Sequence, residues 1–230
     1  MRAILIALLL FTIGSVMGQT VQQPKIDTVI NESNLYTSYF SFKTKTPIIV
    51  TYSLKYKGGS CDRGDEGFSF KTEKSFKKDS LGNPLIATPK DYAKSDYDIG
   101  HNANAKDFNI NCKQEVKTFR FINAIPQKAE LNRGIYRIHE EDVRDYSMED
   151  SCFIFCINEY SKDSPVIGNQ IKVPSRCIKL VYSISKREFV WNLCSAFTNT
   201  ETPIKTLVDA ELFVRKYQLT NGVDLLKLIK

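Results

Sequence analysis

Short segments rich in β-branched and aromatic residues recur along the chain and predict a sheet. Residues 35–42 and 48–54 come first, separated by a short connection that ends at Pro47. Such residues are enriched in strands because their side chains pack well on a pleated surface. Segments of the same character follow at residues 115–122, 152–157, 177–184 and 188–193.

Two further segments have the character of helices, one over residues 131–145 and one over 209–217. Asp209 is a suitable N-cap for the second, because its carboxylate can accept a hydrogen bond from a free backbone N–H of the first turn. Residues 57–94 are rich in Gly, Lys, Ser and Asp without a sustained period, which predicts a long irregular loop of the kind that often carries function. The combination predicts an α+β domain with a mostly antiparallel sheet.

The first eighteen residues have a different pattern and predict a secretory signal peptide. Arg2 precedes the apolar run 3–13, and Gly18 precedes a plausible cleavage point at Gln19. The run is too short to span a membrane comfortably, although an uncleaved N-terminal anchor is the alternative.

The rest of the chain, after the predicted signal peptide, is expected to consist of a short leader and one domain. Residues 19–33 are polar and predict a short flexible leader, which leaves residues 34–230 as a single domain. We therefore expect the mature protein to be secreted or periplasmic, without stable membrane association once the signal is removed.

Composition narrows the class of protein without identifying it. The 230 residues are 42% hydrophobic and 25% charged, which excludes wholesale disorder and a collagen-like repeat. A multi-span membrane protein is excluded because only one segment of the sequence is continuously apolar. Lys and Arg (32) exceed Asp and Glu (26), so the net charge of +6 is compatible with a polyanionic partner.

The chain contains six cysteines, and in an exported protein an even number favours disulfides. A zinc site is the alternative, but the sequence has no Cys-x-x-Cys pair. A two-residue turn at Ser185–Lys186 would place Cys177 directly opposite Cys194, at the separation of about 5.5 Å that a disulfide requires. We therefore predict a Cys177–Cys194 bond.

Two polar clusters carry the candidate chemistry. The first surrounds His101 in DIGHNANAKDF, where Gly100 allows a close backbone approach and neighbouring Asn and Asp residues could hold the ring. A lone histidine is more often structural than catalytic.

The second cluster follows one helix in steps of four, which predicts a slanting polar stripe of Asn132, Tyr136, Glu140 and Arg144. Taken alone, the stripe is typical of a solvated face with a Glu140–Arg144 ion pair. Its opposite sides would then face the core through Ile135, Ile138 and Val143.

Together the clusters resemble the DNA/RNA non-specific endonuclease family, the ββα-metal nucleases. That family carries Asp-Arg-Gly-His with a following Ala-x-Asp, then Ser-Asn-x-x-Pro-Gln, then an Asn-x-Gly-x-Trp-x-x-(Leu)-Glu helix. The matching stretches here are DIGHNANAKDF, INAIPQKAELN and NRGIYRIHEEDVR, in the same order and spacing. Downstream, IGNQIKVPSRCIKLVYSI is similar to the family's Val-Pro-x-x-x-(Phe)-Lys strand.

The resemblance implies a role for each matching residue. His101 corresponds to the general base that takes a proton from the attacking water. Asn132 corresponds to the asparagine whose side-chain oxygen binds a single Mg²⁺, for which Mn²⁺ could substitute. Glu140 corresponds to a glutamate that acts on the water shell of the metal, Asn123 to an asparagine that orients the histidine loop, and Arg144 to an arginine that contacts phosphate.

The sequence departs from the family pattern at three positions. Ile99 replaces the arginine of Asp-Arg-Gly-His, Tyr136 replaces the tryptophan, and His139 stands where an apolar residue is usual. Isoleucine removes a cation that the resemblance places near the phosphate, so we expect slower hydrolysis.

The long loop offers candidates for a replacement cation. Arg63 is its only arginine and is therefore the candidate for the substrate-binding arginine that the family carries upstream of the histidine motif. The loop lysines could supply positive charge there or could equally form a solvated surface; they are Lys71, Lys74, Lys77 and Lys78.

The resemblance implies a secreted, Mg²⁺-dependent endonuclease that hydrolyses both DNA and RNA. Its contacts would go to the phosphate backbone, which is independent of sugar and base and suits a basic protein. The alternative is a catalytically weakened relative that only binds nucleic acid or a protein partner, and Ile99 is the residue that favours it.

Overall fold

The computed structural model describes residues 23–64, 68–73 and 76–229. The predicted signal peptide and Lys74 lie outside these ranges. No helix within the described ranges is long and apolar enough to cross a membrane.

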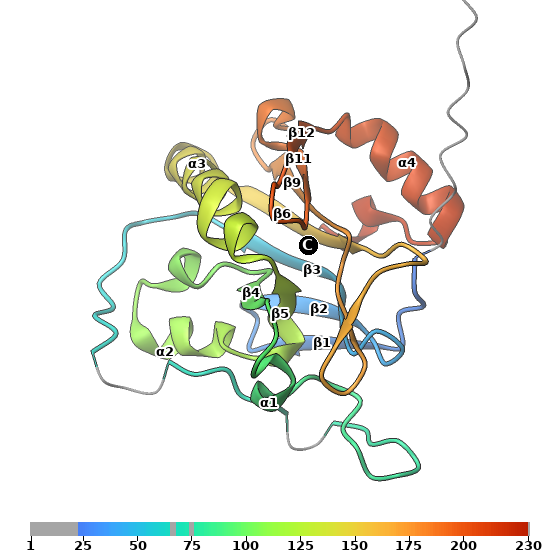
Figure 1. The fold of residues 1–230 in the computed structure, drawn as a ribbon. Coiled ribbons are helices and arrows are strands. Elements are labelled where there is room, and N and C mark those ends of the chain that lie inside the picture. The colour runs from blue at the N-terminus through green and yellow to red at the C-terminus, as the bar shows by residue number, and fades with distance from the viewer. Residues whose placement is uncertain (1–22, 65–67, 74–75, 230) are drawn as a thin grey trace, which may run out of the picture.

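An eight-stranded sheet forms the centre of the molecule, and every strand pairing in it is antiparallel (Figure 1). This confirms the predicted α+β class. In spatial order the strands are β1 (Thr28–Glu32), β2 (Tyr36–Ser41), β3 (Thr46–Leu54), β6 (Cys152–Glu159), β9 (Arg176–Ser183), β11 (Ser195–Thr198) and β12 (Lys205–Leu207), and β10 (Glu188–Phe189) pairs with β9. Two small sheets pair β4 (Asp98–His101) with β5 (Ala124–Gln127) and β7 (Val166–Ile167) with β8 (Ile171–Lys172).

The helices are α1 (Pro89–Tyr92), α2 (Cys112–Glu115), α3 (Tyr136–Glu149) and α4 (Ala210–Asn221). Asp209 caps α4 as predicted, because its side chain accepts a hydrogen bond from the backbone nitrogen of Leu212 at 3.0 Å. A π-helical turn at Leu131–Ile135 leads into α3. Short 3₁₀ turns occupy Ala105–Phe108, Val116–Thr118, Phe121–Asn123, Trp191–Leu193 and Leu225–Leu228.

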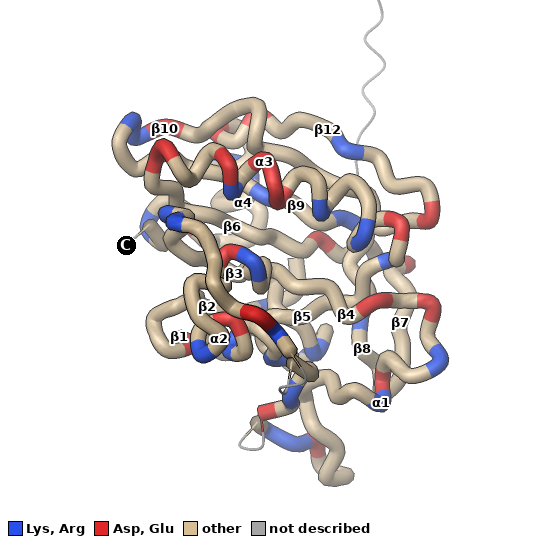
Figure 2. The backbone as a smooth tube through the Cα atoms, turned by 90° about the vertical axis from the view of Figure 1, so that its left-hand side faces the viewer, with Lys and Arg blue, Asp and Glu red and all other residues tan. Residues whose placement is uncertain are grey.

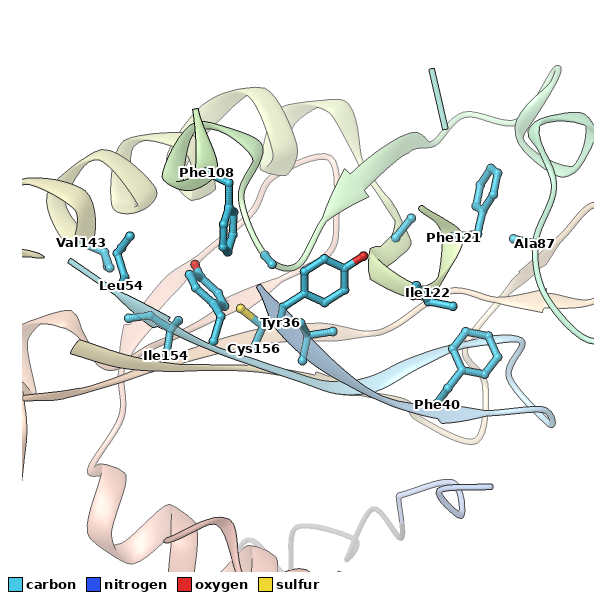
Figure 3. Packing of buried hydrophobic residues seen from close by; sticks show 14 of the residues in the cluster. Tyr36, Phe40, Leu54, Ala87, Phe108, Phe121, Ile122, Val143, Ile154 and Cys156 are labelled. Atoms are coloured by element: carbon cyan, nitrogen blue, oxygen red, sulfur yellow. The ribbon is translucent and has the colours of Figure 1, made fainter. Parts of the chain in front are cut away.

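Both faces of the sheet are buried, because successive side chains of β6 point alternately into two separate hydrophobic cores. Ile154 and Cys156 point toward a core that includes Val143 of α3, drawn in Figure 3. Phe155 points the other way, into a second core that α4 covers. Successive side chains of a strand face opposite sides of the sheet, so β6 lies between the two cores. β4, β5 and α3 lie on the side of the first core.

Three sequence predictions about elements were wrong. Residues 115–122 form the end of α2 and two 3₁₀ turns instead of a strand. Phe121 is buried in the first core, Phe119 is buried against the rings of Phe70 and His101, and the bridge in this segment joins Arg120 to Lys71. Residues 28–32 of the expected leader form edge strand β1, paired with β2 from Thr28–Phe40 to Glu32–Tyr36. The last predicted strand ends at Phe189, followed by the turn at Trp191–Leu193.

That turn also removes the predicted Cys177–Cys194 disulfide. The hairpin has the expected register at Ser183–Glu188 and Tyr182–Phe189, but the strand then breaks. Cys177 consequently lies opposite Phe197 of β11. The disulfide in the described structure joins Cys61 to Cys112, and the other four cysteines are buried free thiols.

Candidate active site

β4, β5 and the helical segment after them form a two-strand-and-helix unit on one face of the sheet (Figure 1). The unit borders a hollow of about 200 Å³. Five of the six predicted site residues line it together, namely Arg63, His101, Asn132, Glu140 and Arg144. The sixth, Asn123, is fully buried behind it.

His101 ends β4 with its ring held between two aromatic rings, Phe70 and Phe119, each 4.6 Å away between centroids. Its Nε2 is buried and has no hydrogen-bond partner among the described residues. Burial, reinforced by the positive charge of Arg63, lowers the pKa of His101 to about 3. The imidazole is therefore neutral across the physiological pH range.

Gly100 is required for that placement. A Cβ on this residue would lie 1.9 Å from the Oε1 of Gln127, which is itself fully buried on β5. The absence of a side chain thus lets β4 and β5 approach closely and fixes where His101 begins.

Asn123 holds the loop that follows His101. Its Oδ1 accepts a hydrogen bond from the Ala103 nitrogen at 2.8 Å, and its Nδ2 donates to the oxygens of Ala103 at 2.9 Å and Thr118 at 3.0 Å. Asn123 therefore lies where it can orient the histidine loop, but it does not line the hollow itself.

Asn132 belongs to the π-helical turn, and the expected uninterrupted helix breaks at Gly134 before α3 begins. The Nδ2 of Asn132 donates to Asp98 at 3.0 Å, while Arg133 donates to the same carboxylate. Because its nitrogen is engaged, the amide oxygen of Asn132 is the end that remains available to the hollow. Such π turns occur frequently at functional sites.

Glu140 does not pair with Arg144, contrary to the sequence prediction. Its Oε1 lies 3.1 Å from the Nζ of Lys179, and its Oε2 accepts a hydrogen bond from Asn104. Burial raises the pKa of Glu140, and the ammonium of Lys179 opposes that rise. Burial would lower the pKa of Lys179, but the neighbouring Cys156 thiol, which carries charge only when ionised, and the carboxylates of Glu140 and Asp107 instead raise it to about 12.

Arg144 pairs with a different carboxylate. Its Nε lies 3.2 Å from the Oδ1 of Asp107, both side chains are buried, and the guanidinium lies 5.7 Å from the ring of Tyr56. The other oxygen of Asp107 accepts a hydrogen bond from Tyr52 at 2.8 Å. The edge of Arg144 that lines the hollow is thus held rigidly.

The faces of α3 are reversed relative to the sequence prediction. Most of the polar stripe is buried, namely Tyr136, Glu140 and Arg144. Ile138 is 50% exposed, and Val143 is the one member of the predicted apolar set that is fully buried. His139 is also fully buried, with its ring 5.1 Å from Phe197. Basic and acidic positions are interspersed along this helix (Figure 2), so its charge pattern alone does not reveal the inward face.

Arg63 reaches the hollow because the loop that carries it is anchored. The guanidinium donates to Glu115 through Nε at 2.8 Å and Nη2 at 2.6 Å, and it lies 5.5 Å from the ring of Phe119. The disulfide connects this loop to α2, the helix that ends at Glu115, through Cys61 and Cys112.

The other loop candidates lie elsewhere. Lys71 lines a neighbouring hollow that shares Arg63, Lys77 lies 5.5 Å from the ring of Phe42, and Lys78 bridges to Pro84. Ile99 is half-buried against the first core and does not line the hollow that contains His101.

Sequence reasoning missed two contributors to this site, Lys179 and Asn104. Lys179 did carry two signals: it is the lysine of the stretch that resembles Val-Pro-x-x-x-(Phe)-Lys, although no role was assigned to it there. It is also the one charged residue in the apolar run CIKLVY, and a strand buried on both faces tolerates no unpaired charge. Asn104 carries none, because an asparagine in a polar loop is ordinary.

The donor atoms at the hollow fit a Mg²⁺ ion. Asn132 offers an amide oxygen and Glu140 a carboxylate, and Mg²⁺ prefers oxygen ligands while it retains several waters. Within the described ranges there is no group of three or more His, Cys, Asp or Glu residues that could hold a metal. The set therefore suits an ion held by few protein atoms rather than a closed cage.

Comparison with known proteins gives two matches of different kinds. The family model described as DNA/RNA non-specific endonuclease matches residues 14–227. The structure is similar to a chain in the crystal structure of the EndoG/EndoGI complex, with a TM-score of 0.63, 22% identity and 84% of each chain covered. At that identity the likeness shows the fold, a large antiparallel sheet with few helices. Comparison with curated protein sequences finds no match.

Proposed function

Because this chain belongs to the DNA/RNA non-specific endonuclease family, we propose that it hydrolyses phosphodiester bonds in both DNA and RNA with one bound Mg²⁺, for which Mn²⁺ can substitute. The observation that carries the proposal is the convergence of His101, Asn132 and Glu140 on one hollow, from three different elements.

His101 is the proposed general base. Its neutral ring can accept a proton from water, and a phosphate bound beside it would raise its affinity for that proton by adding negative charge nearby. Asn123 contributes by fixing the loop at Ala103, so that the ring does not turn away from the hollow.

Asn132 and Glu140 are the residues proposed to hold the metal, directly through the amide oxygen and through the water shell respectively. When bound, a divalent cation stabilises negative charge on the phosphate and on the departing oxygen. Arg144 and Arg63 line the same hollow and would contact phosphate oxygens. Contacts to phosphate carry no information about sugar or base, which supports cleavage without sequence preference.

The binding-only alternative rested on Ile99. Because Ile99 packs against the core while the base and the metal-binding residues line the hollow together, the placement of these side chains supports an enzyme. Export to a secreted or periplasmic location is proposed from the N-terminal sequence, and the Cys61–Cys112 disulfide is compatible with it.

The test is cleavage of plasmid DNA and of RNA by the purified protein in Mg²⁺ and again in excess EDTA. We expect both substrates to be degraded only with the metal, and His101→Ala to abolish cleavage. His139→Gln is the matched control, because this second histidine is buried outside the hollow. Undiminished cleavage by His101→Ala would contradict the proposal.

A further inference from the structure

Lys179 is a charged side chain placed almost entirely inside the protein. It lies on β9, paired with Cys156 of β6 and Ser195 of β11, so strands flank it on both sides. Its side chain is 1% exposed, and its Nζ lies 4.9 Å from the ring of Tyr136 at the start of α3. It does not line the hollow and cannot touch a substrate there.

The ammonium of Lys179 belongs to a buried set of four charges. It contacts Glu140 at 3.1 Å, and its positive charge lowers the pKa of Asp107 against the effect of burial. Asp107 is in turn paired with Arg144 at 3.2 Å. Two positive and two negative groups thus balance one another. Glu140 and Arg144 come from α3, and Asp107 comes from the 3₁₀ turn a few residues beyond His101.

Through this set of charges, Lys179 on the sheet links the loop that follows His101 to helix α3. Among the described residues, no backbone hydrogen bond joins the loop that carries His101 to α3. Glu140 of α3 contacts that loop through Asn104 and the sheet through Lys179. The ammonium of Lys179 contacts the Glu140 carboxylate directly at 3.1 Å, and its positive charge also opposes the rise that burial causes in the pKa of Asp107. The Oε1 of Glu140 has this ammonium as its partner, while Oε2 has Asn104.

We propose that Lys179 is a positioning residue of the nuclease site, which fixes the Glu140 carboxylate relative to the His101 loop. The inference rests on the proposed function. Without the ammonium, Glu140 keeps a single contact from Asn104, and its carboxylate can rotate away from the metal-binding position. Partners of this kind, which hold a metal-binding group without touching the metal, typically change metal affinity or activity by about 10–100-fold.

The experiment compares Lys179→Met, Lys179→Arg, Glu140→Gln and the double variant Lys179→Met/Glu140→Gln. Lys205→Met is the matched control, because Lys205 is exposed on β12 and does not line the hollow. Three quantities are measured for each: thermal melting, kcat and KM on an oligonucleotide, and affinity for Mn²⁺ alone by electron paramagnetic resonance.

For Lys179→Met we expect kcat and Mn²⁺ affinity to fall by about 10–100-fold while KM changes little. Lys179→Arg keeps the charge and should recover part of both. In the double variant the loss should equal that of Glu140→Gln alone, because residues that act through one another are not additive. A purely structural role would lower the melting temperature without this pattern.

Wild-type kcat and Mn²⁺ affinity in Lys179→Met would overturn the inference, as would losses that multiply in the double variant. If Lys179→Met does not fold, the arginine and double variants still decide between these outcomes. Failure of the wild-type protein to cleave any nucleic acid would instead overturn the proposed function, and the Mn²⁺ titration would still test the link from Lys179 to Glu140.

Discussion

The side-chain nitrogen of Asn132 donates to Asp98 across 3.0 Å, which joins the first residue of β4 to the turn before α3. The same carboxylate accepts from Arg133, so one residue of the Asp-x-Gly-His stretch holds two consecutive residues of the turn. The amide of Asn132 is therefore oriented by a group that does not itself line the hollow.

Asp98→Ala should weaken the metal dependence without removing any proposed ligand. Loss of this contact lets the Asn132 amide rotate, so we expect about 10–100-fold more Mg²⁺ to be needed for half-maximal cleavage. Asn132→Ala, which deletes the proposed ligand, should be more severe. A Mg²⁺ midpoint in Asp98→Ala that matched the wild type would show that the amide needs no such support.

Gly100→Ala should damage both stability and activity. The new Cβ would lie 1.9 Å from the Oε1 and 2.7 Å from the Cγ of buried Gln127, so either the Gln127 side chain must leave its position or β4 and β5 must separate. Overpacking of this kind costs about 1–3 kcal/mol in free energy of unfolding, and His101 moves with the strand. Chemical denaturation and cleavage rates measure the two effects.

Gln127→Ser in the Gly100→Ala background is the control for that prediction. The shorter side chain removes the atoms that the Cβ would meet, so it should restore part of the lost activity. No recovery in the double variant would mean that Gln127 is not the source of the clash.

Reduction of the disulfide should weaken substrate binding more than catalysis. The Cys61–Cys112 bond closes a span of 51 residues, and its removal by serine substitution at both positions should cost about 2–4 kcal/mol of stability. Arg63 would then lose its fixed position beside Glu115, so KM should rise and its dependence on salt should become shallower. Dithiothreitol should reproduce the change in the wild type and add nothing in the double variant.

His139→Phe should make the protein less sensitive to acid. His139 is fully buried, its ring nitrogens have no partner among the described residues, and burial with nearby Lys179 and Lys205 lowers its pKa to about 3. An unfolded chain binds a proton there below about pH 6.5, whereas the folded chain does not until about pH 3. Stability is therefore lost as pH falls through that window.

The wild type should accordingly lose about 2 kcal/mol through this residue between pH 7 and pH 5, and the variant should not. Urea denaturation at the two pH values measures the difference. If the wild type and His139→Phe lost equal free energy of unfolding between these pH values, the acid sensitivity would come from other groups.

The sequence predicts the strands best where the apolar pattern is long and both faces are buried, as in β3, β6 and β9. It fails at residues 115–122, where Phe119 and Phe121 are two residues apart, as on one face of a strand, but are buried from short turns instead. The local pattern cannot separate these outcomes, because two aromatic residues at this spacing are compatible both with a short strand and with a turn whose rings pack inward.

The sequence names residues that the structure brings together at one hollow, but it does not predict the charged partners of those residues. Glu140 and Arg144 have the spacing of a helical ion pair, yet each finds a buried partner from a distant part of the chain, Lys179 and Asp107. Such pairings depend on which helix face meets the sheet. An amphipathic pattern gives the wrong face here, because the inward side of α3 carries the polar groups of the site.

The backbone nitrogen of Gln23 donates to the side chain of Asn221 at 3.0 Å, so the first described residue and the end of α4 meet at one corner of the molecule. α4 packs on the second core, behind the sheet as seen from the hollow. A fusion partner or a solid support attached before Gln23 would thus stand behind the sheet. A long polymer would still be able to approach His101 from the open side, which makes this end the suitable point for immobilisation.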